Sequence, residues 1–163
     1  ECDNIAEVRY KGITSSLTYI RKLITEGDME QAGEFLGHPH VLTDIVRYGY
    51  RLGRTLGTPT INMCFQEGVL IPAYGVYATR VYLDDNSEHI GVTNVGIRPT
   101  VNNSDQVTAE TYILNFTGNL YGKMVRVEFY KRMRPEIKFN SKDELKEQIR
   151  KDAENSYNYF HGI

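Results

Sequence analysis

The chain has 163 residues, of which 40% are hydrophobic and 25% are charged, a composition typical of a globular protein with one domain and room for an appendage. Its net charge of −2 argues against a nucleic-acid-binding surface, and its apolar runs are too short to span a membrane, so neither nucleic acid nor a membrane is an expected partner. The distant Cys2 and Cys64, together with the lack of a secretory-signal pattern, predict a cytoplasmic protein without a disulfide framework.

The N-terminal part predicts a helical hairpin over residues 16–37. Ser15, Ser16 and Thr18 offer N-cap oxygens to the first helix, and Gly27 is placed to end that helix. Asp28 and Gln31 have the spacing of a capping box and would begin the second helix.

Beyond residue 40 the hydrophobic pattern changes to the alternation of period two that is typical of β-strands. Six strands are predicted, at residues 41–48, 61–65, 75–83, 89–95, 107–116 and 125–132. Because turns rather than helices connect most of these segments, the pattern favours an antiparallel barrel over a parallel sheet.

The C-terminal part predicts one helix that begins at Ser141, with Glu144 three residues later in the position of a capping box. Its apolar side chains fall on one stripe, which consists of Leu145, Ile149, Ala153, Tyr157 and Phe160. We expect this stripe to pack against the barrel and the charged face to be solvated.

A glycine-rich segment precedes the second predicted strand. Gly53 and Gly57 give a loop that bends easily and lets a ligand approach the backbone, and Arg54 adds a positive charge. Thr60 and Asn62 follow two residues apart, so on an extended strand their oxygens point the same way. Such a loop with a pair of neutral oxygen ligands suits a magnesium nucleotide; the alternative is a glycine-rich turn before an edge strand.

Glu110 lies within a predicted strand whose residues alternate between the two faces of a sheet. A buried carboxylate there has a raised pKa and suits a general base, whereas the alternative is an exposed strand glutamate. Residues 94–100 are predicted as a loop, either a ligand rim at the end of the barrel or a simple turn. Arg134 follows the last strand and is either a site residue or a surface charge.

Together these segments resemble riboflavin kinase, in the form of the C-terminal kinase module of bacterial bifunctional riboflavin kinase/FAD synthetases. The segments that carry the resemblance occur in the family's order: 53–62, 75–78, 94–100, Glu110, 120–122, 133–139, 148–149 and Asp152. The resemblance implies a mainly β fold, a six-stranded antiparallel Greek-key barrel with a C-terminal helix, preceded by the helical hairpin.

Residues 16–21 are similar to the segment that closes the FMN adenylyltransferase domain of such enzymes. The implied division is a helical remnant of that domain over residues 1–37 and a riboflavin kinase domain over residues 38–163. The kinase is normally fused to that domain, nearly all of which is absent here, so FAD synthesis is not expected of this chain.

The resemblance implies Mg²⁺-dependent transfer of the ATP γ-phosphate to the terminal ribityl hydroxyl of riboflavin, giving FMN and ADP. Glu110 would be the base, and Thr60 and Asn62 would hold the metal. The implied ATP-binding residues are Gly53, Arg54, Gly57, Thr58, Pro59, Thr60 and Asn62. The implied flavin-binding residues are Asn94, Gly96, Arg98, Pro99, Thr100, Tyr121 and Arg134.

The chain departs from the family pattern at a few positions. Asp44 stands where the family usually has glycine, Thr58 replaces an aromatic residue, and Ile61 replaces a small residue. Leu17 replaces a serine in the N-terminal segment. These departures leave an alternative function: a regulatory module on the same fold that binds flavin or nucleotide with weak catalysis.

Overall fold

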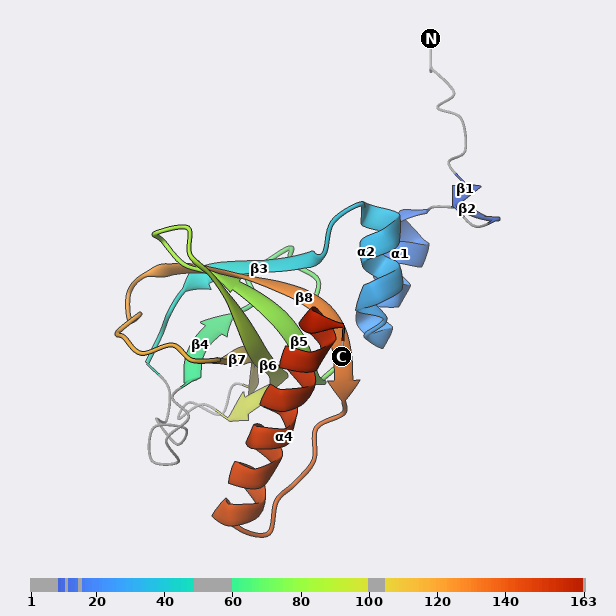
Figure 1. Ribbon diagram of the computed structural model, residues 1–163. Helices are drawn as coiled ribbons and strands as arrows, with labels where there is room; N and C mark the ends of the chain where they lie inside the picture. Colours follow the sequence, from blue (N-terminus) through green and yellow to red (C-terminus); the bar gives the residue numbers. More distant parts are fainter. Residues whose placement is uncertain (1–8, 11, 15, 49–59, 100–104, 163) are drawn as a thin grey trace.

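The computed structural model describes residues 9–10, 12–14, 16–48, 60–99 and 105–162 (Figure 1). Its main strands are β3 (His40–Ile45), β4 (Thr60–Cys64), β5 (Gly75–Tyr82), β6 (Glu88–Pro99), β7 (Asp105–Ile113) and β8 (Met124–Arg134). Its helices are α1 (Leu17–Glu26), α2 (Met29–Leu36) and α4 (Lys142–His161). A short hairpin of β1 (Arg9–Tyr10) and β2 (Ile13–Thr14) precedes α1.

The six main strands form one antiparallel sheet in the order β3-β8-β5-β6-β7-β4. β5, β6 and β7 are consecutive neighbours, and β8 returns to lie beside β5, which is the Greek-key arrangement. The outer strands β3 and β4 meet just past the end of β3, where the Arg47 N–H donates to the Asn62 carbonyl over 2.8 Å. The sheet therefore curves into a barrel, and the predicted fold class is confirmed.

The barrel interior is filled by apolar side chains and by a short row of hydroxyl groups. Tyr77 and Phe129 pack edge to face, with 5.4 Å between their ring centroids, and both are fully buried. The hydroxyl of Thr93 is 2.9 Å from each of the hydroxyls of Thr79 and Thr111. Because these buried polar groups bond to one another, they do not destabilise the core.

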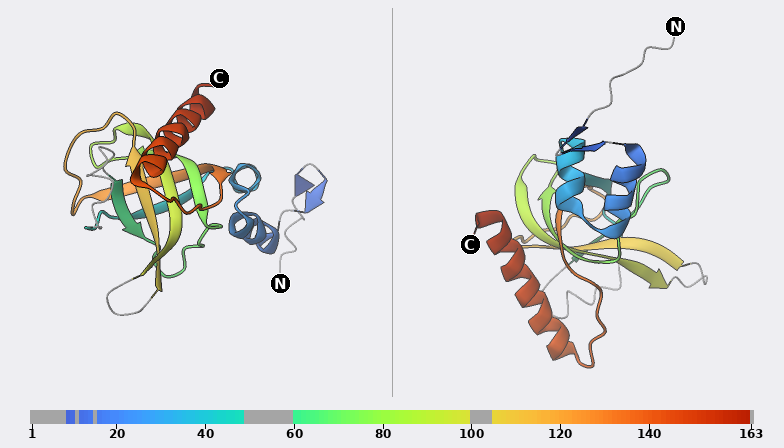
Figure 2. Two further views of the ribbon diagram at one scale, coloured as in Figure 1. Left: turned by 90° about the horizontal axis from the view of Figure 1, so that it is seen from below. Right: turned by 90° about the vertical axis from the view of Figure 1, so that its right-hand side faces the viewer.

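The predicted helical hairpin is confirmed, with the expected caps. The Ser16 hydroxyl accepts a hydrogen bond from the backbone of α1, and Asp28 does the same for α2. Gly27 ends α1 at φ 87°, and a Cβ there would lie 2.6 Å from a carbon of Arg132 on β8, so the residue allows both the turn and close packing. The hairpin lies against one end of the barrel (Figure 2) and shares its hydrophobic cluster; the proposed division at residue 37 stays a prediction.

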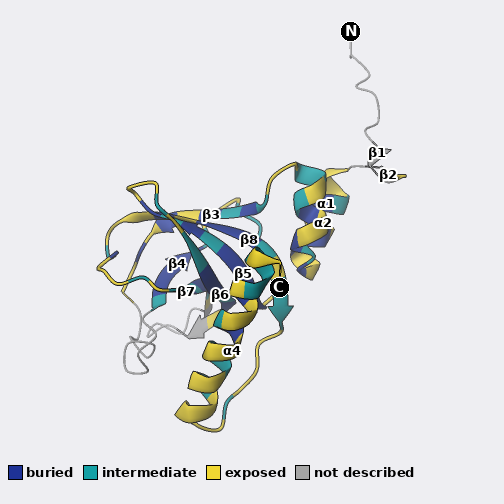
Figure 3. Ribbon diagram, viewed as in Figure 1, coloured by how far each residue is buried: buried dark blue, intermediate teal, exposed yellow. Residues whose placement is uncertain are grey.

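Helix α4 begins after Ser141 as predicted and lies across β5 and β6, with its outer face exposed (Figure 3). The predicted apolar stripe is placed wrongly at Tyr157, which is 44% exposed, while the buried positions are Asp152 and Ser156. Ser156 donates to the Gly91 carbonyl over 2.9 Å. Polar groups occupy the buried face because each has a bonding partner on the barrel, a property that hydrophobic periodicity does not report.

The segment 94–100 differs from the predicted loop, because its residues up to Pro99 belong to β6. They pair with β7 as far as Pro99 opposite Asp105, so a ladder distant in sequence keeps the segment extended. The predicted strand 41–48 is shorter, since β3 ends at Ile45. Within the described residues, no helix has the length and apolar character needed to cross a bilayer.

Candidate functional site

Three polar side chains lie in one row across β4, β7 and β6. Asn62 is directly opposite Glu110, and Glu110 is directly opposite Asn94. Residues opposite each other in an antiparallel sheet project to the same face. The flanking residues Met63 and Ala109 are fully buried in the barrel, so the row faces outward.

A second row lies beside the first. Thr60 is opposite Tyr112, which in turn is opposite Val92. Thr60 and Asn62 therefore share the outer face of β4, as their spacing predicts for a strand. Thr60 is half-buried and Asn62 is 6% exposed, so both sit in a recessed part of the surface.

A cavity of about 200 Å³ lies between this outer face and α4. Its lining on the sheet side is Thr60, Val92, Asn94, Glu110 and Tyr112. The opposite wall comes from the end of β8, the connection to α4 and α4 itself: Arg134, Glu136, Ile137, Phe139, Leu145, Ile149 and Asp152. The cavity thus combines apolar side chains with a few polar groups, as ligand sites usually do.

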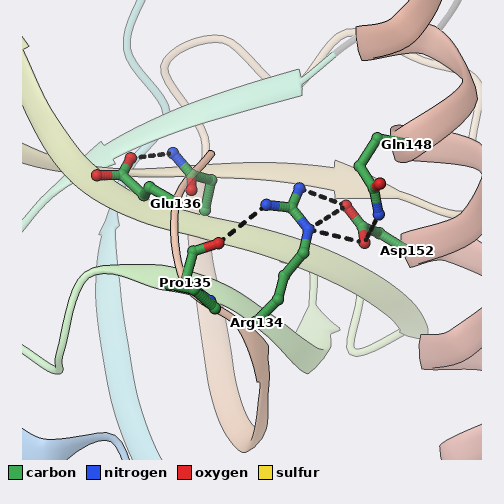
Figure 4. Close-up of polar contacts among 6 residues, drawn as sticks. Arg134, Pro135, Glu136, Gln148 and Asp152 are labelled. Carbon is green, nitrogen blue, oxygen red and sulfur yellow. Dashed lines mark hydrogen bonds and ion pairs between the residues drawn. The ribbon is translucent and has the colours of Figure 1, made fainter. Parts of the chain in front are cut away.

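Arg134 is held in the cavity wall by an ion pair with Asp152 (Figure 4). Its Nε is 3.0 Å from Asp152 Oδ1, and its Nη2 is 2.7 Å from Oδ2. Gln148 donates to the same carboxylate over 2.9 Å, and Arg134 Nη1 donates to the Pro135 carbonyl over 3.0 Å. This two-pronged contact connects the end of β8 to α4, on either side of the cavity wall.

Glu136 is a cavity residue that sequence reasoning did not single out. It accepts a hydrogen bond from Asn94 Nδ2 over 3.1 Å. A Cβ at Gly96 would collide with the Glu136 carboxylate, so the glycine makes room for this side chain. Its only sequence signal was its place inside the segment 133–139.

A second cavity, of about 390 Å³, lies on the other side of Thr60. Besides Thr60, its lining includes Val46, Ile61, Asn119 and Tyr121. The ring of Tyr121 stacks on Tyr48, with 4.1 Å between centroids and an interplanar angle of 19°. The structure therefore separates Tyr121 from Asn94 and Arg134, with which the resemblance grouped it.

The seam between β3 and β4 runs beside Asn62. Asp44, which is 5% exposed, accepts hydrogen bonds from the Cys64 backbone N–H over 2.9 Å and from Gln66 Nε2 over 2.8 Å. The Arg47 guanidinium lies 3.3 Å from the same carboxylate. Burial by itself raises the pKa of Asp44, but the Cys64 N–H and the Arg47 guanidinium outweigh it, and the pKa is lowered from its ordinary value.

Several predicted site residues lie outside the described residues: Gly53, Arg54, Gly57, Thr58, Pro59 and Thr100. Arg98 and Pro99 are described only as backbone of β6. The other predicted residues of the site all lie on one of the two cavities or beside them.

The oxygens near Asn62 fit a magnesium ion that is carried by phosphate. Thr60 and Asn62 offer neutral oxygens on one face, and Glu110 lies opposite Asn62. Mg²⁺ takes few ligands from protein and completes its shell with phosphates and waters. In the described part of the chain, no three His, Cys, Asp or Glu side chains gather as a metal site.

Comparison with known proteins places the chain in a family. A family model described as "Flavokinase: Riboflavin kinase" matches residues 36–160. A "Bifunctional riboflavin kinase/FMN adenylyltransferase" of Bacillus subtilis is 34% identical over 164 residues, which cover 99% of this chain and 52% of that protein. The protein of the same description from Haemophilus influenzae is 42% identical over 145 residues, 89% of this chain and 46% of that protein.

A crystal structure from Streptococcus pneumoniae, described as a macrolide-efflux protein, superimposes with a TM-score of 0.87 at 31% identity and covers 94% of this chain and 50% of that one. The chain spans about half the length of the curated relatives it matches. Because the family model covers most of the barrel and α4, the chain belongs to the riboflavin kinase family.

Proposed function

We propose that this chain is a riboflavin kinase, which transfers the γ-phosphate of ATP to the terminal ribityl hydroxyl of riboflavin and releases FMN and ADP. The observation that carries the proposal is the row in which Glu110 stands between Asn62 and Asn94, with Glu110 and Asn94 on the lining of the cavity under α4. This row puts a carboxylate beside a candidate magnesium ligand on one wall.

Glu110 serves as the general base in this proposal. Its carboxylate accepts the proton of the ribityl hydroxyl while the hydroxyl oxygen forms a bond to the γ-phosphorus, and the bond from phosphorus to the ADP oxygen breaks. Directly opposite strand residues have Cβ atoms about 4.5–5.5 Å apart. A ribityl hydroxyl that is hydrogen-bonded to Glu110 would therefore lie near a phosphate held at Asn62. Positioning of this kind supplies much of the catalysis in phosphoryl transfer.

Thr60 and Asn62 hold Mg²⁺ together with the phosphates in this proposal. When bound, the ion neutralises charge on the transferred phosphoryl group and orients it. The side-chain oxygens of both residues stand on the outer face of β4, and Thr60 lies on the lining of both cavities. The phosphates of ATP would therefore lie beside Thr60, with the flavin in one cavity and the adenosine in the other.

The two cavities suit the two substrates, riboflavin and ATP. The cavity under α4 offers apolar walls, together with Asn94, Glu136 and Arg134, for a flavin ring. The second cavity offers the ring of Tyr121, stacked on Tyr48 directly before residues 49–59, and suits an adenine. We thus assign Tyr121 to the nucleotide side instead of the flavin side.

The proposal extends to the surroundings of the chain. The chain covers about half of each curated relative, and the names of those relatives include an FMN adenylyltransferase. We infer that the kinase works joined to such a domain and that it acts in the cytoplasm. A regulatory module without turnover is the other candidate, but Thr60, Asn62 and Glu110 stand together on one face, which favours the kinase.

Incubation with riboflavin, ATP and Mg²⁺, followed by chromatographic separation of flavins, tests the proposal. FMN that appears with Mg²⁺ and disappears with a chelator supports it. Binding of both substrates without FMN would refute the kinase and favour the regulatory module.

A further inference from the structure

The site lies next to the least supported junction of the barrel. Among the described strands, β4 is the last of the sheet and has a full ladder with β7 alone, and β3 is the last strand on the other side. Within the described residues, β3 and β4 are joined in register only by the bridge between Arg47 and Asn62. The strand that carries Thr60 and Asn62 is thus an edge strand along most of its length.

Asp44 fills this junction with side-chain contacts. It lies on the inward side of β3, with the fully buried Leu42 two residues before it. Its Oδ2 accepts the Cys64 N–H over 2.9 Å, and its Oδ1 accepts from Gln66 Nε2 over 2.8 Å. The carboxylate thereby accepts a hydrogen bond from a backbone N–H of β4 that would otherwise pair with the carbonyl of a neighbouring strand.

The same carboxylate also supports the bridge at Asn62. Arg47 donates its backbone N–H to the Asn62 carbonyl over 2.8 Å, while its guanidinium pairs with Asp44. Asn62 is therefore held from one side by the Arg47 backbone, and Cys64, two residues along the strand, is held by Asp44 itself. Among the described residues, Asp44 thus contributes to two hydrogen-bonded contacts between β4 and the segment of β3 and Arg47.

We propose that Asp44 is a positioning residue for the nucleotide side of the reaction. Its carboxylate replaces a strand ladder at the β3–β4 seam and keeps Thr60 and Asn62 aligned with Glu110 on the outer face. The inference rests on the proposed function for its kinetic consequence, but the attachment of β4 is a property of the fold alone.

The chemistry of the seam explains why an acid is required. The Cys64 N–H, the Gln66 amide N–H and the Arg47 guanidinium are all donors directed at one carboxylate. Asp44→Asn nearly keeps the shape but replaces an acceptor oxygen with an NH₂ group, which faces these donors without accepting from them. β4 then loses part of its attachment while its ladder to β7 remains.

The test compares Asp44→Asn with Glu128→Gln. Glu128 is a buried strand carboxylate that accepts from the Tyr130 hydroxyl over 2.9 Å and pairs with Arg126, but it lies on β8, away from β4. We expect Asp44→Asn to raise KM for MgATP about tenfold, the loss of roughly one charge-assisted hydrogen bond, with KM for riboflavin within about twofold. Glu128→Gln leaves both constants within about twofold.

Hydrogen exchange followed by mass spectrometry gives a readout independent of turnover. Peptides over residues 60–66 exchange faster in Asp44→Asn than in the wild type, while peptides over residues 105–113 do not change. Arg47→Met keeps the backbone bridge and removes a half-exposed guanidinium, and we expect it to raise KM for MgATP about threefold. This variant replaces Asp44→Asn in the test if Asp44→Asn does not fold.

Equal changes in both KM values, or unchanged exchange at residues 60–66, would overturn the role of Asp44. A wild-type protein that forms no FMN would refute the proposed function instead. Exchange and calorimetric titration with MgADP would then decide the role of Asp44 on their own: weaker nucleotide binding with faster exchange at β4 supports it, and wild-type values for both refute it.

Discussion

Asp152→Asn tests the ion pair that fixes α4 to the barrel. The carboxylate of Asp152 is 3% exposed and pairs with Arg134, whose side chain is 19% exposed. Breaking a buried ion pair lowers the free energy of unfolding by roughly 3–5 kcal/mol. Because water reaches part of Arg134 and asparagine keeps one acceptor oxygen, we expect the free energy of unfolding to fall by about 2–3 kcal/mol. For a chain of 163 residues this corresponds to a decrease of about 4–12 °C in Tm.

Thermal and urea unfolding followed by circular dichroism measure this loss. Glu154→Gln is the matched control, because Glu154 lies on the same helix, pairs with Arg150 and is 61% exposed; its Tm should stay at the wild-type value. KM for riboflavin should rise more than KM for MgATP in Asp152→Asn, since Arg134 lines the cavity under α4. A Tm within about 2 °C of the wild type would refute the reasoning that this pair holds α4.

Three further predictions concern the row and the seam. Glu110→Gln should keep the fold, as judged by circular dichroism, and lower kcat by roughly two to four powers of ten, so near-normal turnover would disprove its role as base. Asn62→Ala should weaken MgATP binding more than riboflavin binding in calorimetric titrations, and equal losses would contradict a role at the metal. Because the pKa of Asp44 is lowered in the folded protein, its carboxylate stabilises the fold above the unfolded aspartate pKa of about 3.9, and this contribution is lost as pH falls through the lower folded value. The difference in unfolding free energy between wild type and Asp44→Asn should be constant above about pH 5 and shrink below about pH 4; a difference that does not change with pH would refute this.

The elements were largely predictable because their signals are local. Ser16, Asp28 and Ser141 cap the helices that their positions predicted, since a side-chain oxygen at an N-cap acts only on the next few residues. The extent of β6 was not predictable, because Arg98 and Pro99 are extended by pairing with β7 rather than by their own preferences.

Sequence spacing does not report how the proposed site residues are arranged. Spacing placed Thr60 and Asn62 on one face of β4, but strand register, which no local pattern reports, puts Glu110 opposite Asn62. The position of Tyr121 on the second cavity depends on a contact with Tyr48, far away in the sequence. Asp44 shows the limit of prediction from sequence. The sequence marks it only as a departure from a family pattern, whereas the fold shows that it joins β3 to β4.

The two halves of the site are supported differently, and this difference follows from strand order. Glu110 lies on β7, which is paired on both sides, with β6 and with β4. Asn62 lies on β4, which has a ladder on one side and the contacts of Asp44 and Arg47 on the other. A base needs a fixed position to within about 0.5 Å, which a strand inside the sheet provides. A metal ligand on β4 needs the same precision, and on an edge strand that precision depends on the contacts of Asp44 and Arg47. We therefore expect the seam at Asp44, more than any contact around Glu110, to determine the affinity for nucleotide.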